Sequence, residues 1–343
     1  MSASPNVDYS EPVDLFSQQK RNRRRSAWLI AGFVLFFAWL GFGGDYIAYL
    51  YTRDVEPGEY RHAIPWFGAL LTLIGVGMAA YAWRSGASQV LKSTNAREII
   101  DPQNEVERQY VNVVEEMAIA SGLPRPRTWL IDDPDPNAFA TGRDALSAHV
   151  AVTDGLLLAI DRDELQAVLA HEMGHIKNLD VRLMTLLAAL VGTIVLLSDG
   201  LWRVLFRGGL RGGKRGGGKK GGNPVLLILL VVWVVSWILA PIIVRFLALS
   251  VSREREYLAD AMSAQFTRNP LALASALEKI EHAAEPTKQI KRGTAHLCIV
   301  DPLGRSANLR QGWFATRFAT HPPMAVRVAR LKAMGYRAAK ATS

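Results

Sequence analysis

Apolar residues gather in four long blocks along this chain, separated by segments in which charged and polar residues are frequent. Two of the blocks, residues 27–44 and 64–83, contain no charged residue. A helix needs about 20 consecutive apolar residues to cross a hydrocarbon core about 30 Å thick. The pattern therefore predicts two transmembrane helices within residues 27–83. Two buried core helices of a soluble protein are the alternative.

The other two blocks surround a basic, glycine-rich segment. Residues 183–197 are short for a membrane span, whereas residues 225–249 are long enough. Between them, residues 203–224 hold seven basic residues and no acidic one, and their glycines predict a flexible loop. Either both blocks of residues 183–249 span the membrane and the loop violates the positive-inside rule, or they form a shallow hairpin that returns to the cytoplasm. We favour spanning, because the fourth block is so apolar.

The net charge of +9 is concentrated beside the apolar blocks. A basic run at residues 20–25 immediately precedes the first block and places the polar N-terminal tail, residues 1–26, in the cytoplasm. Arg84, Lys92 and Arg97 follow the second block on the same side. Because these charges flank membrane segments and no nucleic-acid-binding motif accompanies them, we expect no nucleic-acid partner. The lipid bilayer is the partner that this distribution indicates.

The segments outside the blocks predict an α+β domain in two parts, residues 84–182 and 250–335. Residues 104–121 have the apolar spacing of an amphipathic helix, and a second helix is expected to begin near Asp161 or Asp163. The last two of three expected strands are predicted to pair in a small antiparallel sheet. The three strands are expected at residues 128–131, 137–142 and 149–153.

The five residues 171–175 spell HEMGH and follow an apolar stretch that favours a helix. Residues four apart lie on one helix face, one turn apart, so the imidazoles of His171 and His175 can bind one metal ion. Glu172 is rotated to the side, where it reaches a water molecule on that metal. This is the H-E-x-x-H arrangement of zinc peptidases.

A catalytic zinc site needs a third protein ligand and one open position. Glu256 and Asp260 are four residues apart after the fourth apolar block and share one helix face. We predict Glu256 as the third ligand and Asp260 as the acceptor of the free ring N–H of His171. A solvated charged helix is the alternative for residues 252–260. Asp180, just after the HEMGH run, is a second candidate ligand, for which we favour a structural role.

These motifs resemble those of the HtpX family of membrane zinc metallopeptidases, relatives of the CAAX prenyl endopeptidases. The resemblance runs from the first apolar block to Leu331 and includes the segments HEMGH, EREYLAD, NAFATG, VAVTDGLL and THPP. It implies a predominantly helical, multi-pass protein of the cell inner membrane, active in the stress response, with a gluzincin-like peptidase domain that faces the cytoplasm. The long N-terminal tail and the glycine-rich loop depart from the family pattern.

The resemblance also implies roles for residues outside the HEMGH run. Asn137, Ala138 and Phe139 match an edge strand that binds the substrate backbone. His321 and Arg327 match positions near the active site, where a cation could stabilise the oxyanion. The zinc ligands and the catalytic glutamate that the resemblance implies are the residues already named.

The expected function is zinc-dependent endopeptidase activity, with one Zn²⁺ per chain, toward misfolded or damaged membrane or cytoplasmic polypeptides. Zinc would lower the pKa of its water and polarise the scissile carbonyl, and Glu172 would transfer the proton to the leaving amine. A non-catalytic zinc-binding membrane scaffold and a prenyl-protein endopeptidase are the alternatives; the latter would need a large intramembrane chamber. The sequence leaves open whether the chain forms a homo-oligomer.

Overall fold

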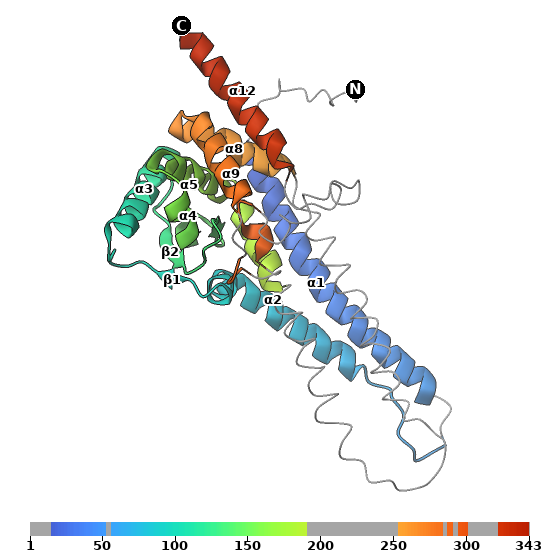
Figure 1. Ribbon diagram of the computed structural model, residues 1–343. Helices are drawn as coiled ribbons and strands as arrows, with labels where there is room; N and C mark the ends of the chain where they lie inside the picture. Colours follow the sequence, from blue (N-terminus) through green and yellow to red (C-terminus); the bar gives the residue numbers. More distant parts are fainter. Residues whose placement is uncertain are drawn as a thin grey trace.

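The structure, a computed structural model, describes residues 15–52, 56–190, 253–283, 287–290, 294–300 and 322–342. Within these ranges the chain is mostly helical, with one small sheet, and a long helical hairpin extends from the rest of the molecule (Figure 1). The glycine-rich loop, the fourth apolar block, residues 191–197 of the third block and His321 lie outside the described residues.

The hairpin consists of α1 (Leu15–Thr52) and α2 (Trp66–Ser93), which pack against each other. Each helix contains a stretch long and apolar enough to cross a membrane. Only 28% of that stretch in α1 and 22% in α2 is buried. Large apolar side chains such as Leu70 and Leu73 therefore face outwards, as a lipid-facing helix surface requires. Both helices lie where the apolar blocks predicted them.

Helix α1 is longer than its apolar block at both ends, and Asp45, the first residue after that block, contacts the start of α2. The Asp45 carboxylate is buried and accepts hydrogen bonds from the backbone N–H groups of Phe67, at 3.1 Å, and Gly68, at 2.6 Å. It also lies 2.7 Å from Nε2 of His62. A carboxylate at a helix N-terminus satisfies free N–H groups and the helix dipole. Asp45 thus joins the end of α1 to the start of α2.

Four short strands form one sheet in the spatial order β1-β2-β4-β3. The strands β3 and β4 are antiparallel, as the sequence predicted, but β2 and β4 are parallel. The prediction of an antiparallel sheet is therefore wrong for the sheet as a whole, which is mixed. The chain forms β3 at the far edge and returns as β4 between β2 and β3, so β4 runs in the direction of β2. The strand bounds are β1 (Arg97–Glu98), β2 (Arg127–Ile131), β3 (Ala138–Thr141) and β4 (His149–Thr153).

Helices cover the sheet, and its two faces belong to two apolar cores. Ala140, Val150 and Val152 pack with residues of α3 and α5, whereas Phe139 and Ala151 pack with residues of the hairpin and of residues 183–190. The α-helices of this part are α3 (Glu105–Ser121), α4 (Asp154–Ala159), α5 (Arg162–Lys177), α8 (Arg253–Thr267), α9 (Pro270–His282) and α12 (Met324–Thr342). Two short 3-10 helices are η1 (Ala145–Ser147) and η3 (Ala295–Leu297).

The amphipathic helix predicted over residues 104–121 is confirmed as α3. The Asn104 side chain caps it by accepting the backbone N–H of Glu107 at 2.8 Å. Tyr110 and Val114 lie on its buried face, and the Tyr110 hydroxyl donates a hydrogen bond to a carbonyl of β4 at 2.9 Å. This contact fixes α3 on the sheet face that also receives α5.

Candidate metal centre

The two histidines of the HEMGH run lie on α5, and Asp161 is the residue that begins this helix. The Asp161 carboxylate accepts the N–H of Glu164 at 2.9 Å, and the Glu164 carboxylate accepts the N–H of Asp161 at 2.9 Å. This reciprocal pair satisfies two free N–H groups of the first turn. Because α5 continues without interruption, His171 and His175 lie one turn apart on the same face.

Helix α8 approaches α5 closely because Gly174 has no side chain. A Cβ at position 174 would lie only 3.2 Å from Cα of Ala259 on α8. The Ser263 hydroxyl, one turn further along α8, donates to the carbonyl of Ala167 at 2.7 Å. This close crossing places Glu256, near the start of α8, over the two histidines.

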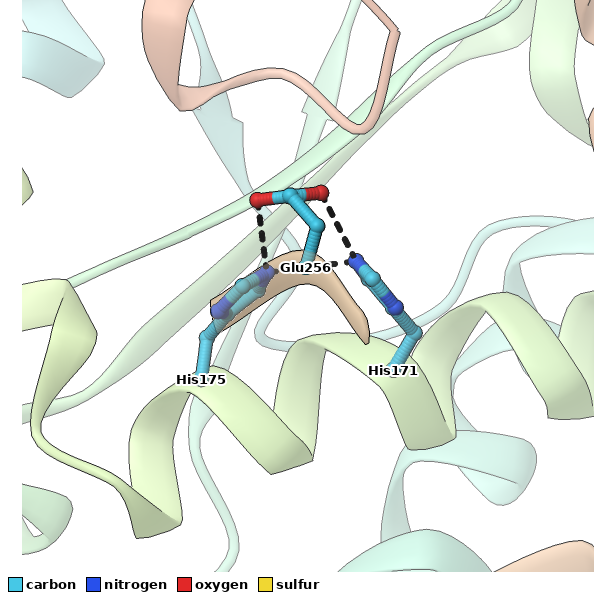
Figure 2. Close-up of side chains that lie close together, drawn as sticks. All are labelled: His171, His175 and Glu256. Atoms are coloured by element: carbon cyan, nitrogen blue, oxygen red, sulfur yellow. Dashed lines mark hydrogen bonds and ion pairs between the residues drawn. The ribbon is translucent and has the colours of Figure 1, made fainter. Parts of the chain in front are cut away.

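Glu256 reaches both histidines from α8 (Figure 2). The Nε2 atoms of His171 and His175 lie 3.2 Å apart, and the Glu256 carboxylate oxygens lie 3.8 Å from the first and 3.6 Å from the second. Ligand atoms at about 2.0–2.1 Å from a tetrahedral zinc ion are about 3.3–3.4 Å apart. The three side chains therefore fit one divalent metal ion. Among the described residues they are the one such group of histidine, cysteine and carboxylate side chains.

Glu172 lies beside the candidate ligands and lines a small cavity together with His175 and Glu256. The cavity has a volume of about 20 Å³, which is room for one water-sized group, and Val181, Met184 and Leu297 form part of its wall. The Glu172 carboxylate accepts a hydrogen bond from the backbone N–H of Ala140 on β3. Burial raises the pKa of Glu172 to about 7, so this side chain can take up or release a proton near neutral pH.

Asp260 and Arg327 lie behind His171 and Glu256. Oδ1 of Asp260 is 3.0 Å from Nδ1 of His171, and the Arg327 guanidinium donates to both Asp260 oxygens at 2.9 and 2.7 Å. Arg327 also donates to the carbonyl of Ile299 and lies 3.4 Å from Glu256. Burial opposes ionisation of Asp260, but the charge of Arg327 and the hydrogen bonds from His171 and Arg327 together outweigh burial and lower the pKa of that carboxyl. The buried guanidinium thus faces the carboxylates rather than the cavity.

Asp180 contacts the second histidine and connects it to α1. Its Oδ2 lies 3.2 Å from Nδ1 of His175, at the ring nitrogen that faces away from Glu256. Its Oδ1 accepts a hydrogen bond from the side-chain N–H of Asn22 at 2.7 Å, and Asn22 also donates to the carbonyl of Asn178 at 2.9 Å. Asn22 is buried, although it lies in the basic run before the first apolar block. The sequence around Asn22 did not predict that this side chain would be buried.

The Asn22 contacts predict that a residue of α1 influences metal binding. Replacing Asn22 with Ala removes the donor to Asp180 and leaves His175 less firmly oriented, so we expect the affinity for zinc to fall about 10-fold. Gln19→Ala is the matched control, because Gln19 donates to the Lys177 carbonyl at 2.7 Å without touching Asp180. Competition with a fluorescent zinc chelator measures both affinities. Equal losses in the two variants would contradict a specific role for Asn22.

The charge around His175 predicts how metal binding depends on pH. Burial lowers the pKa of His175, but the hydrogen bond to Asp180 and the charges of Glu256, Asp180 and Glu172 together outweigh burial and raise it to about 9. Metal binding requires the neutral imidazole. At pH 8, where Glu172 is already mostly ionised, zinc should release about one proton per chain, and its affinity should rise about 10-fold per pH unit from pH 7 to 9 before levelling off. Calorimetry in two buffers of different ionisation enthalpy measures the release; none at pH 8 would contradict it.

The three residues expected to bind substrate, on or beside β3, are buried: Asn137, Ala138 and Phe139. The Ala138 carbonyl accepts the N–H of Ile299 at 2.9 Å, and the Asn137 side chain donates to the Val300 carbonyl at 2.9 Å. Residues 294–300 therefore lie along the edge of β3 where a substrate strand was expected. No feature of the sequence indicated this contact, because the two segments are far apart along the chain.

One helix carries two histidines one turn apart, a second helix places a glutamate where it can complete a ligand set, and a further glutamate lies beside them. This is the arrangement expected of a metallopeptidase site. The comparisons with known proteins agree. Residues 104–335 match the model of Peptidase family M48. The chain belongs to peptidase family M48 and is a metalloprotease.

Two relatives are both described as "Protease HtpX homolog". The one from Dictyoglomus thermophilum is 39% identical over 95% of this chain and 97% of its own length. The one from Tropheryma whipplei is 42% identical over 78% of this chain and 86% of its own length. A solved structure, "Crystal Structure of S. mikatae Ste24p", aligns with 93% of this chain and 66% of that chain at 18% identity. With a TM-score of 0.41, this likeness supports no conclusion about the fold or function of the chain.

Proposed function

We propose that this chain is a membrane-anchored, gluzincin-like zinc endopeptidase that cleaves unfolded or damaged proteins in proteolytic quality control. One observation carries the proposal: the candidate ligand atoms of His171, His175 and Glu256 lie within 4.8 Å of one another, and Glu172 lines a cavity with His175 and Glu256. Structural zinc sites are closed by four protein ligands, whereas three protein ligands leave one position open for chemistry. The protease name of the relatives supports the same interpretation.

The donor set favours zinc over other divalent ions. Two imidazoles and one carboxylate are the ligands that zinc uses in hydrolytic enzymes. When bound, zinc polarises the scissile carbonyl and makes the attacking water more acidic. Carboxylate oxygens of Asp260 and Asp180 lie 3.0 and 3.2 Å from the Nδ1 atoms of His171 and His175, respectively. An N–H at each Nδ1, held by a carboxylate, leaves each Nε2 free to bind the metal.

Glu172 performs the proton transfers in the proposed mechanism. Its carboxylate accepts a proton from the attacking water and then donates it to the nitrogen of the leaving amine. A pKa of about 7 suits both steps, because the ionised and the protonated side chain are close in free energy at neutral pH. The hydrogen bond from the N–H of Ala140 keeps the carboxylate beside the ligands.

Arg327 is proposed to position the ligand carboxylates. Its guanidinium binds Asp260 through two hydrogen bonds and lies beside Glu256, and one of its nitrogens lies 3.5 Å from Nε2 of His171. Arg327 can therefore orient both side chains. Stabilisation of the oxyanion by His321 or Arg327 stays a prediction, since His321 lies outside the described residues.

The substrate is proposed to bind as an added strand along β3. An extended peptide gains main-chain hydrogen bonds at a sheet edge whatever its sequence, which suits a protease for unfolded chains. The contact between Ile299 and Ala138 occupies this edge, so substrate binding requires residues 297–300 to move away from β3. Polypeptide segments that are already unfolded can take their place most readily.

Helices α1 and α2 are proposed to span the cell inner membrane, as part of a multi-pass protein. Both are apolar enough to do so, and the basic run at residues 20–25 lies at the end of α1 that contacts the peptidase domain through Asn22. By the positive-inside rule this end, and with it the metal centre, faces the cytoplasm.

The test of the proposal is cleavage of one substrate protein in two forms, native and permanently unfolded by reduction and alkylation. The full-length protease in detergent, with zinc, should cleave the unfolded form at least about 10-fold faster, because only an extended segment can pair with a sheet edge. A prenylated C-terminal peptide is the third substrate. Faster cleavage of that peptide would favour the prenyl-protein endopeptidase, and no cleavage of any substrate would favour the scaffold.

A further inference from the structure

A second cavity, which is polar, lies between α2 and the turn that follows β3. Its volume is about 110 Å³, several times the room that one water molecule needs. Arginines from three separate elements line it: Arg84 on α2, Arg143 in the turn after β3, and Arg182 on the helical residues 180–190. No described residue lines both this cavity and the cavity of the metal centre. The cluster is therefore a separate feature of the surface. We call it the arginine pocket.

The Arg182 guanidinium is held in place by two neighbours. Its Nε donates to the backbone carbonyl of Arg143 at 2.8 Å, and its guanidinium carbon lies 5.4 Å from the centre of the Trp83 ring. These contacts use Nε and one face of the group. Among the described residues, no hydrogen-bond partner is found for its two terminal nitrogens, which are the donors that recognise phosphate oxygens.

The turn that carries Arg143 is fixed against residues 180–190. Gly142 has φ +152°, and a Cβ there would lie 2.8 Å from the carbonyl oxygen of Ser147. The Gly142 N–H donates to Oγ1 of Thr185 at 3.0 Å, and this hydroxyl also bonds the Thr141 hydroxyl at 2.8 Å. The walls of the arginine pocket are thus in place before any ligand arrives, which lowers the entropic cost of binding one.

The arginine pocket has more positive than negative charge. No aspartate or glutamate is among the described residues that line it, and the nearby Asp144 already pairs with Arg143 at 3.3 Å. Burial, and after it the charge of Arg23 on α1, lowers the pKa of Arg182, whereas the charge of Asp144 raises it. Arg23 and Arg182 therefore repel each other across the edge of the pocket. His149 contributes no charge, because burial lowers its pKa to about 4. A bound anion would relieve the repulsion.

The position of the pocket along α2 indicates where the anion comes from. Residues 64–83 carry no charge, and both Trp83, the last of them, and Arg84, the first charged residue after them, line the pocket. The start of α1, which carries the basic run, lies at the same end of the hairpin as the end of α2, beside the other helices (Figure 1). Arg23 in that run is close enough to Arg182 for its charge to lower the pKa of Arg182. Tryptophan and arginine at the end of a membrane span lie at the level of the lipid headgroups. Basic pockets at that level bind anionic headgroups.

We propose that the arginine pocket binds the phosphate group of an anionic lipid headgroup, with Arg84, Arg143 and Arg182 as donors. The proposal rests on the proposed membrane placement of α1 and α2 but not on peptidase activity. A headgroup in the pocket bridges α2 to the turn after β3. Strand β3 is the strand along which the substrate is proposed to bind. A bound anionic lipid would therefore hold the peptidase domain in one orientation relative to the bilayer, and the fraction of chains held in this way would depend on the lipid composition of the membrane.

The experiment measures lipid binding to full-length protein by native mass spectrometry, in a Glu172→Gln background that prevents self-cleavage. Phosphatidylglycerol and phosphatidylcholine with the same acyl chains are added in turn. One phosphatidylglycerol should bind at least about 10-fold more tightly than phosphatidylcholine. The Arg143→Gln/Arg182→Gln variant should bind it about 30-fold more weakly, a loss expected for two basic groups at a membrane surface.

Two further variants, each with one exposed arginine replaced, separate a loss of lipid binding from a loss of folding. Arg84→Gln removes one exposed arginine of the pocket, and we expect an affinity about 5-fold lower. Arg125→Gln removes the same charge from an exposed loop between α3 and β2, outside the pocket, and should bind phosphatidylglycerol normally. Zinc affinity measured on each variant reports whether the peptidase domain is intact.

Three outcomes would overturn the proposal. Equal binding of both lipids, or an unchanged preference in the Arg143→Gln/Arg182→Gln and Arg84→Gln variants, would show that the arginine pocket is not the lipid site. Displacement of the lipid by millimolar inorganic phosphate, with tight phosphate binding in lipid-free detergent, would identify a soluble anion as the ligand. Displacement by a soluble glutamate-rich peptide, with no preference between lipids, would make the pocket a polypeptide site.

Discussion

Replacing Glu172 with Gln is expected to slow peptide hydrolysis by a factor between about 100 and 10,000 while leaving zinc bound. Gln has the shape of Glu and can still accept the hydrogen bond from the N–H of Ala140, but it cannot take a proton from water. The metal should stay, because Glu172 is not among the three ligand residues. Cleavage of an unfolded substrate and zinc content by mass spectrometry are measured on the same sample.

A second buried glutamate of α5 is the control for this variant. Glu164 accepts hydrogen bonds from Ser275 and Lys279, both at 2.6 Å, and lies about two turns from Glu172. Glu164→Gln should lower thermal stability but keep the turnover number, since Glu164 takes no part in the chemistry. Rapid cleavage by the zinc-loaded Glu172→Gln protein would exclude Glu172 as the base.

Replacing Glu256 with Gln is expected to lower zinc affinity by about 100-fold or more and to abolish cleavage. Zinc binding by four protein ligands is worth about 10–16 kcal/mol, so one ligand accounts for roughly 3 kcal/mol. The amide also leaves Arg327, 3.4 Å away, without a carboxylate partner on that side. We therefore also expect a lower melting temperature. Chelator competition and a thermal melt measure the two effects.

Glu254→Gln is the control on the same helix. Glu254 is exposed in the first turn of α8, two residues before Glu256, and its replacement should leave zinc affinity and cleavage unchanged. Asp180 is the rival third ligand that the sequence offered. Normal zinc affinity in Glu256→Gln, together with a loss in Asp180→Asn larger than about 100-fold, would assign the third ligand position to Asp180 instead.

The local parts of the candidate site were predictable, because they depend on spacing within single elements. The HEMGH run and the cap at Asp161 follow from the period and end signals of one helix. To predict that Glu256 lies close to the histidines required a second motif and a family resemblance, because no rule of local spacing connects two segments so far apart along the chain. Its physical cause, the missing side chain at Gly174, became visible only when α8 was placed on α5.

The long-range parts could not be predicted, because they depend on how distant segments pack. The parallel pairing of β2 with β4 follows from β4 entering the sheet between β2 and β3, which strand patterns alone do not reveal. The basic residues on either side of Asn22 are exposed, and only the contact of Asn22 with Asp180 accounts for the burial of its side chain. In the same way, the cover that Ile299 provides over β3 depends on a contact between distant segments.

The most direct test of the central claim is a zinc titration of the metal-free, full-length protein with cleavage of an unfolded substrate as the readout. The account predicts no cleavage without metal, activity that rises linearly with zinc and saturates at one equivalent per chain, and loss of activity when a chelator is added. Full cleavage by protein shown to contain no metal, or zinc binding at one equivalent without any cleavage, would contradict it.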